Sequence, residues 1–121
     1  MQNAEEFEKR RERLNELVLS KADLSMKRLF ALDQDVYSDG ALPKKTKELL
    51  GLVASTVLRC NDCISHHLMQ AVACGTTDEE VVEALGIALV VGGSITIPHL
   101  RYAMEFLGAI DQAEEEPASN E

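Results

Sequence analysis

The sequence predicts an all-α fold, a compact bundle of about five to six helices, and three observations support this prediction. Only three prolines and seven glycines interrupt the 121 residues, which is few for a turn-rich β protein. Apolar residues make up 45% of the chain and include no tryptophan, so the core is expected to be mainly aliphatic. No segment alternates between apolar and polar residues for long enough to form a strand.

A chain of this length corresponds to one domain, and we expect residues 1–121 to form a single helical domain. Its core is expected over residues 24–111, preceded by an N-terminal helix over residues 1–22. Four apolar residues recur at helical spacing in that first helix: Phe7, Leu14, Leu17 and Val18. The acidic and polar residues 112–121 are expected to form a frayed tail.

The second helix is expected over residues 24–36, where Ser20 or Asp23 can cap the first turn. Its apolar side consists of four residues: Leu24, Leu29, Phe30 and Leu32. The segment 37–43 is the clearest loop, because it contains an Asp-Gly turn signal and ends in a proline that suits the start of a helix.

The middle of the chain is expected to form two helices, over residues 44–59 and 61–74. Asn61 and Asp62 are good capping residues for the second of them, and Gly75 suits its left-handed end. The first is expected to turn a lysine-rich face to solvent: Lys44, Lys45 and Lys47.

The last part of the chain predicts two more helices. A Thr-x-x-Glu capping box at residues 77–80 opens a helix over residues 81–91, and a glycine pair ends it. The final helix is expected to start at Ser94 or Pro98 and to end at Asp111. The helix over residues 81–91 is apolar almost all round, and such a helix usually needs a partner subunit to cover it. This feature predicts a homo-oligomer, and a central helix in a monomer is the alternative.

The formal net charge of the chain is −9, from 21 acidic and 12 basic residues. This charge repels phosphate backbones and anionic lipids, so nucleic acid and membranes are not expected as partners. The N-terminal residues contain no apolar signal region, which predicts a cytoplasmic protein. The apolar segment 81–100 is interrupted by Glu83, a glycine pair and Pro98, so its continuous part is too short to span a bilayer.

Residues 60–67, with the sequence CNDCISHH, carry the strongest functional signal in the chain. On a helix that begins at Cys60, His67 lies four residues after Cys63 and on the same face as both cysteines. A helix N-terminus and a neighbouring imidazolium both stabilise a thiolate, whose parent thiol has a pKa of about 8.5 when free. The two sulfurs are also close enough to form a disulfide. This arrangement predicts thiol redox chemistry.

Other interpretations of these residues stay open at this point. Two cysteines three residues apart in an apolar helix can be small core residues. A single Cys-x-x-Cys motif can also supply half of a zinc or iron–sulfur site, with His66, His67 or Glu48 as further ligands. Glu48 can equally be an ordinary exposed helix residue. The third cysteine, Cys74, is expected to be a small buried residue.

Four residues form the pattern E-x11-C-x2-C-x3-H: Glu48, Cys60, Cys63 and His67. This pattern resembles the carboxymuconolactone decarboxylase family, and more narrowly its alkylhydroperoxidase D branch, and the resemblance covers residues 24–110. It implies an all-α fold that assembles into trimers or hexamers. It also implies that Cys63 attacks a peroxide and Cys60 resolves the product, with a proton relay formed by Glu48 and His67. In other proteins with this motif the N-terminal cysteine attacks, so the order of the cysteines stays open.

Two further points concern the same residues. Asp62 stands where the peroxidase branch has a histidine, and its negative charge opposes thiolate formation. On one straight helix Glu48 would lie about 18 Å from Cys60, so it can join the relay only if the chain turns back near residue 60. Three more residues are candidates for the surrounding pocket: His66, Asp62 and His99. A local hydrogen bond at the start of a helix is the alternative for His99.

The sequence therefore predicts a thiol-dependent oxidoreductase that reduces hydroperoxides or disulfides and needs no cofactor. The expected partners are a small hydroperoxide or disulfide, a thiol reductant that the sequence does not identify, and further copies of the chain in a trimer or hexamer. Lactone decarboxylation is not expected, because the decarboxylase branch lacks the cysteine pair. The alternatives are a metal or iron–sulfur protein and a redox sensor without turnover.

Overall fold

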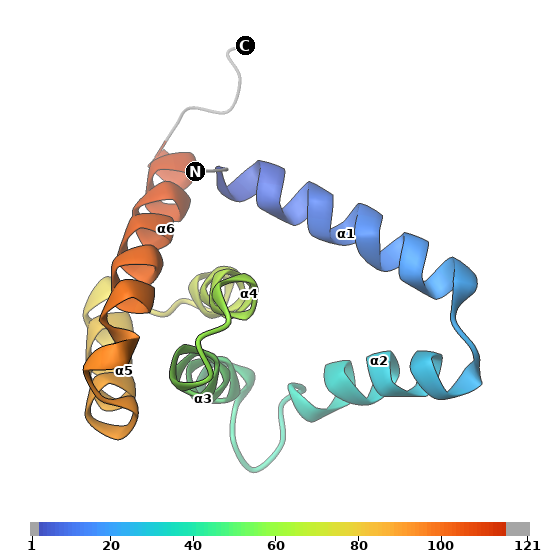
Figure 1. Ribbon diagram of the computed structural model, residues 1–121, viewed down its shortest axis with the longest axis horizontal. Coiled ribbons are helices and arrows are strands. Elements are labelled where there is room, and N and C mark those ends of the chain that lie inside the picture. Colours follow the sequence, from blue (N-terminus) through green and yellow to red (C-terminus); the bar gives the residue numbers. More distant parts are fainter. Residues whose placement is uncertain (1–2, 116–121) are drawn as a thin grey trace.

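The computed structural model describes residues 3–115, and it is built from helices (Figure 1). In chain order they are α1 (Ala4–Lys21), α2 (Leu24–Val36), α3 (Lys44–Val57), α4 (Asn61–Ala73), α5 (Asp78–Gly92), the 3₁₀ helix η1 (Ser94–Thr96) and α6 (Ile97–Glu115). No strand occurs in this part of the chain. The all-α prediction is confirmed.

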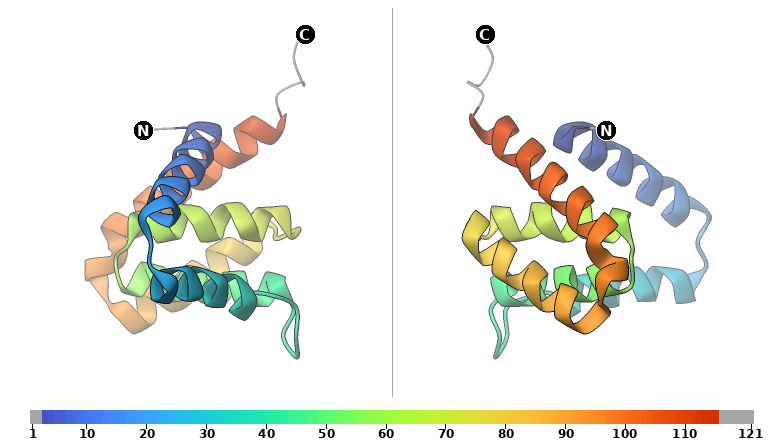
Figure 2. Two further views of the ribbon diagram at one scale, coloured as in Figure 1. Left: turned by 90° about the vertical axis from the view of Figure 1, so that its right-hand side faces the viewer. Right: turned by 60° about the vertical axis from the view of Figure 1, so that its left-hand side comes forward.

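The hydrophobic core lies where α3 and α4 pack side by side and α5 and α6 cover them (Figures 1 and 2). Its largest fully buried apolar side chains come from four helices: Leu52, Ile64, Leu68, Leu85 and Phe106. Four of these five side chains are leucine or isoleucine, so the core is mainly aliphatic, as the composition predicts. The pairing of α3 with α4 matters most for function, because it brings together residues that lie far apart in the sequence.

The first two helices form an arm, here called the α1–α2 arm, that reaches away from the core (Figures 1 and 2). Only the first turns of α1 are anchored, through buried Ala4 and Phe7, and the ring of Phe7 meets Phe106 edge-on at 5.4 Å between centroids. No residue of α2 is buried. The predicted apolar side of α2 exists, but Leu29 is 64% exposed, so this chain does not bury that side.

Helix α5 also keeps apolar side chains in solvent. One face, with Val81 and Leu85, packs into the core, while the opposite face exposes Ile87, Val90 and Val91. A partner subunit that covers the exposed faces of α2 and α5 remains a prediction.

Local sequence signals set most of the helix ends. Asp23, and not Ser20, caps α2 by accepting a hydrogen bond from the backbone of Met26. Thr77 and Glu80 form the predicted capping box of α5. The last helix differs from the prediction, since α6 continues beyond residue 111 to Glu115, and residues 116–121 of the expected tail lie outside the described residues.

The turn between α3 and α4 places a non-glycine residue in a left-handed conformation. Arg59 has φ of 62°, its N–H binds the carbonyl of Thr56, and the N–H of Cys60 binds the carbonyl of Ser55. This is the Schellman motif, in which the left-handed position is usually glycine. The same motif ends α4, where Gly75 takes that position with φ of 88°.

Arg59→Gly is expected to raise the free energy of unfolding by about 0.5–1 kcal/mol, because glycine removes the steric cost of the left-handed conformation. The midpoint of chemical denaturation measures this change. Gly75→Ala is the matched control at the equivalent position of α4, and it should shift the midpoint in the opposite direction. A destabilised Arg59→Gly protein would show that the arginine side chain contributes more than the backbone strain costs.

Candidate functional site

The Schellman turn reverses the chain, so that α4 runs back along α3 and brings Glu48 against His67. The Nδ1 atom of His67 lies 2.8 Å from Oε1 of Glu48, although 19 residues separate the two in sequence. Glu48 is 1% exposed and His67 is 8% exposed, so the pair is shielded from water. The chain reversal on which the relay depends is present, and Glu48 is not an ordinary exposed helix residue.

The two cysteines lie at the N-terminus of α4 and are joined in a disulfide, with their Cα atoms 5.3 Å apart. Cys60 is the N-cap, and α4 begins at Asn61, the predicted start of this helix. Its sulfur accepts a hydrogen bond of 3.2 Å from the backbone N–H of Cys63. Cys60 is half-buried and Cys63 is exposed. The interpretation of this pair as small core residues is therefore wrong.

Electrostatics keep the Glu48 carboxylate ionised. Burial raises the pKa of Glu48 and is the largest single influence, but hydrogen bonds from His67 and Lys44 act against it and the net pKa is lowered. The ammonium of Lys44 lies 2.7 Å from Oε2 of Glu48. An ionised Glu48 accepts hydrogen bonds only, so it orients the imidazole by accepting a hydrogen bond from Nδ1–H.

The prediction that Lys44, Lys45 and Lys47 form a solvated face is wrong. Lys44 is bound to Glu48, and Lys45 lies 3.0 Å from a carboxylate oxygen of Glu80 on α5. The ammonium of Lys47 donates to two backbone carbonyls just before and within the loop after α2, at Val36 and Ser38. These lysines therefore connect α3 to its neighbours.

Besides Lys44, two residues of the site were not predicted from the sequence. The hydroxyl of Tyr37, at the end of α2, lies 3.5 Å from Nε2 of His67, and the two rings are 5.1 Å apart. Gly51 on α3 leaves the space for this contact, because a Cβ atom there would lie 2.7 Å from the Tyr37 hydroxyl and 2.8 Å from Cε1 of His67. Gly51 lies three residues after Glu48, so helical periodicity offers a signal for it. No comparable signal points to Tyr37.

His67 is four residues after Cys63 on the same helix, as predicted, but its hydrogen bonds go elsewhere in the disulfide form. Nδ1 is paired with Glu48 and Nε2 with Tyr37. Within residues 3–115, neither ring nitrogen of His67 is hydrogen-bonded to a cysteine sulfur. His67 and the disulfide therefore both belong to α4 without a direct hydrogen bond between them.

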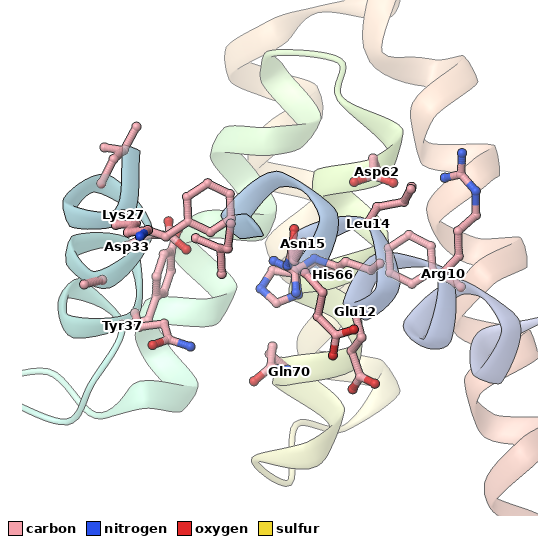
Figure 3. Close-up of a pocket in the computed structure, with 18 of the residues that line it drawn as sticks. Arg10, Glu12, Leu14, Asn15, Lys27, Asp33, Tyr37, Asp62, His66 and Gln70 are labelled. Atoms are coloured by element: carbon pink, nitrogen blue, oxygen red, sulfur yellow. The ribbon is translucent and has the colours of Figure 1, made fainter. Parts of the chain in front are cut away.

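A groove of about 1240 Å³ lies between the α1–α2 arm and the helices α3 and α4 (Figure 3). Two of the predicted pocket residues, His66 and Asp62, line it from α4, together with Tyr37, Lys44 and Glu48. The structure places His99 elsewhere, at the start of α6, where its Nδ1 lies 2.7 Å from Oδ1 of Asn61. His99 therefore contacts the first helical residue after Cys60. Cys74, expected to be buried, is partly exposed.

His66 carries the largest pKa shift of the site. Burial, followed by the charges of Arg11 and His67, lowers the pKa of His66 from 6.5 to about 4. Between these two pH values the unfolded chain binds the proton that folded His66 does not bind, so stability falls as the pH falls from 6.5 to about 4.

His66→Gln is expected to weaken this acid sensitivity. Partial exposure reduces the full effect of the shift, and we expect the variant to retain about 1–2 kcal/mol that wild type loses over that interval. Urea denaturation at several pH values measures the difference. Between pH 7 and pH 8 the two stability curves should run parallel, and equal slopes below pH 6 would contradict the assignment.

Among the residues described, no group of three or more His, Cys, Asp or Glu side chains is arranged to hold a metal ion. No helix in residues 3–115 combines the length and apolar character needed to cross a bilayer.

The helical fold, the cysteine pair at a helix N-terminus and the buried glutamate–histidine pair together define a class of protein. The chain belongs to the carboxymuconolactone decarboxylase family, whose sequence model matches residues 23–106. The family resemblance inferred from the four-residue pattern is confirmed.

Particular relatives support this membership. The crystal structure of TM1620 from Thermotoga maritima is similar to this chain with a TM-score of 0.88 and 59% identity, over 90% of this chain and 96% of that chain. TM1620, of which a second crystal structure is known, is a carboxymuconolactone decarboxylase family protein with a suggested involvement in the antioxidative response. The family protein lpg0406 from Legionella pneumophila has a TM-score of 0.74 and 30% identity, over 84% of this chain and 90% of that one. An uncharacterised protein of the cox locus of Paracoccus denitrificans is 35% identical over 83 residues, which are 69% of this chain and 75% of that protein.

Proposed function

We propose that the protein is a thiol-dependent oxidoreductase in which Cys60 and Cys63 cycle between disulfide and dithiol and reduce hydroperoxides or disulfides. The observation that carries the proposal is the buried Glu48–His67 pair one helical turn beyond a cysteine pair at the N-terminus of α4. The suggested antioxidative role of TM1620 agrees with it.

The reduced site has the groups needed to form a thiolate. Free backbone N–H groups and the helix dipole at the start of α4 favour negative charge on sulfur. His67, which Glu48 holds through Nδ1, comes four residues after Cys63 on α4, and in the proposed reaction it accepts the Cys63 proton at Nε2. Asp62 is exposed and opposes this effect, although water and salt screen its charge.

The reduction of one hydroperoxide consumes two thiols, those of Cys63 and Cys60. The thiolate of Cys63 attacks one oxygen of the hydroperoxide, the O–O bond breaks, and the alcohol leaves with a proton from the relay. Cys60 then attacks the sulfenic acid of Cys63, a disulfide forms, and water leaves. The peroxide gains two electrons and the cysteines lose two, so a reductant must supply two electrons and two protons to restore the dithiol.

The exposure of Cys63 supports its assignment as the attacking cysteine and that of Cys60 as the resolving cysteine. An external thiolate can reach the exposed sulfur of Cys63, and the thiolate of Cys60 is then the leaving group. The Cys63 N–H that binds the Cys60 sulfur in the disulfide form can stabilise that leaving thiolate. A disulfide substrate would react by the reverse exchange, in which the Cys63 thiolate attacks it and forms a mixed disulfide that Cys60 resolves.

We also propose that the protein is cytoplasmic and forms a trimer or a hexamer. A thiol reductant, which the sequence does not identify, restores its dithiol. The exposed apolar faces of α2 and α5 support an assembly. Sedimentation of the protein in both redox states tests it, and a monomer at micromolar concentration would contradict it. A change of assembly upon oxidation without any turnover would favour the redox-sensor alternative.

A stoichiometric reaction tests the proposed function directly. Fully reduced protein is mixed with one equivalent of tert-butyl hydroperoxide or of a small aromatic disulfide, and its thiols and disulfides are followed by mass spectrometry. We expect two thiols to be lost per oxidant and the Cys60–Cys63 disulfide to form. Thiols that react no faster than free cysteine would refute the proposal. Stoichiometric zinc or iron after anaerobic purification, with thiols that cannot be titrated, would favour the metal-binding alternative.

A further inference from the structure

We propose that Tyr37 is a positioning residue of the redox site, which holds the imidazole of His67 through its hydroxyl while the cysteines are oxidised. This inference rests on the proposed function, since it assigns His67 the role of proton acceptor for Cys63. Tyr37 lies outside the pattern of four residues that links the chain to its family, and it belongs to a different part of the fold.

The hydrogen bonds of His67 determine which nitrogen can act as a base. Nδ1 faces Oε1 of Glu48 at 2.8 Å, and an ionised carboxylate accepts but cannot donate, so Nδ1 carries the proton. In the neutral imidazole Nε2 is then the acceptor, and the group that faces it is the hydroxyl of Tyr37 at 3.5 Å. Burial and the charge of Glu48 raise the pKa of Tyr37, which keeps this hydroxyl protonated and able to donate.

In the proposed mechanism Cys63 gives its proton to Nε2 of His67, the same atom that the Tyr37 hydroxyl faces. In the disulfide form neither cysteine has a proton to give, and Tyr37 donates to Nε2. A distance of 3.5 Å is at the long limit of hydrogen bonding, so this contact is weak and the thiol of reduced Cys63 can replace it. Tyr37 keeps the imidazole of His67 from flipping between catalytic cycles. It does not block proton transfer from Cys63 to that imidazole.

The surroundings fix Tyr37 in this place. Gly51 lets both side chains pack closely against α3, because a Cβ atom there would lie 2.7 Å from the Tyr37 hydroxyl and 2.8 Å from Cε1 of His67. Lys47 anchors the end of α2 to α3 by donating to the carbonyls of Val36 and Ser38, at 2.8 Å and 2.7 Å, on either side of Tyr37. The tyrosine is thus attached to the core although the rest of α2 is exposed.

The titratable and charged groups at this site come from several elements. They are Glu48 and Lys44 on α3, His66 on α4, Tyr37 at the end of α2, and Asp33 on α2 and Arg11 on α1, whose charges act on His66. Because so many charges act there, a rate measured at one pH cannot isolate the hydroxyl of Tyr37. The test therefore reads the state of the imidazole directly.

Tyr37→Phe removes the hydroxyl and keeps the ring, so the fold should be retained. The control is Tyr102→Phe, because the hydroxyl of Tyr102 also contacts α4, at 2.6 Å from Ser65, but does not contact His67. In the oxidised wild type, ¹⁵N NMR of His67 should show a protonated Nδ1 and an Nε2 that accepts a hydrogen bond. Tyr37→Phe should move the Nε2 shift toward that of an acceptor without a hydrogen bond, while Nδ1 stays protonated against Glu48. Tyr102→Phe should leave both nitrogens unchanged.

The rate of thiol oxidation completes the experiment. We expect Tyr37→Phe to slow disulfide formation by tert-butyl hydroperoxide about 2- to 10-fold, as for the loss of one weak hydrogen bond, and Tyr102→Phe to react like wild type. An unchanged Nε2 signal in Tyr37→Phe would overturn the inference even if the enzyme is active. A changed signal with an unchanged rate would overturn it as well. If wild type itself does not react, the proposed function fails, and the NMR comparison still decides whether Tyr37 holds His67.

Discussion

Cys63→Ser is expected to abolish the reduction of hydroperoxides and disulfides, with a rate loss of about 10³-fold or more, because serine cannot replace a thiolate nucleophile at neutral pH. Cys60→Ser should behave differently. Its Cys63 can still react once with a hydroperoxide, so one equivalent is consumed and a sulfenic acid accumulates without a disulfide. Stopped-flow measurement of peroxide loss, with trapping of the sulfenic acid by a dimedone probe, separates the two variants.

Cys74→Ser is the matched control for both substitutions, since Cys74 is the remaining cysteine and is not part of the disulfide. It should react like wild type. If Cys60→Ser lost the first reaction and Cys63→Ser kept it, the order of the two cysteines would be reversed. Wild-type rates in both variants would remove the cysteine pair from the chemistry.

Gly51→Ala is expected to damage both stability and activity, although it adds one methyl group. That methyl group would collide with the hydroxyl of Tyr37 and with the ring of His67, and both lie within 3 Å of it. Forcing an atom into a packed site costs about 1–3 kcal/mol of the free energy of unfolding. A displaced imidazole should also lower the rate of thiol oxidation by about 10- to 100-fold, because proton transfer depends on alignment. Thermal denaturation and the peroxide assay measure the two effects.

The control for Gly51→Ala is the same substitution in another helix. Gly108 lies within α6, and an added Cβ there meets no atom within 4 Å. Gly108→Ala should stabilise the protein by about 0.5–1 kcal/mol, since alanine is the better helix former and nothing obstructs it. Opposite signs for the two variants would show that the loss at residue 51 comes from the contact with Tyr37 and His67. A Gly51→Ala protein as stable and active as wild type would mean that the site tolerates a shifted His67.

The helices could be predicted from the sequence because their causes are local. The capping box at Thr77 and Glu80, the left-handed Gly75 and the cap at Asp23 each act within a few residues of the helix end that they define. The turn at Arg59 was placed correctly as a boundary, but its left-handed residue was not foreseen, since glycine is the usual signal for that conformation. The end of α6 was placed four residues too early, because the acidic segment that continues it has no strong stop signal.

Half of the site could also be predicted. Cys60, Cys63 and His67 lie within one helix or at its cap, so helical geometry alone relates them. Glu48 required the reversal of the chain, which the sequence allowed but did not prove. Tyr37, Gly51 and Lys44 were missed as site residues, because each acts through contacts with groups on other helices or through the space beside them.

The sequence by itself determined that this protein is helical, where most of its helices begin and end, and that a cysteine pair stands one turn from a histidine. These features follow from backbone hydrogen bonding and side-chain periodicity within single segments. Only the tertiary structure decided that Glu48 is buried against His67, that Tyr37 meets the other ring nitrogen, and that the α1–α2 arm leaves a groove beside them. The physical reason is that burial and the pairing of distant polar groups depend on how α2, α3 and α4 pack, which no short stretch of sequence specifies.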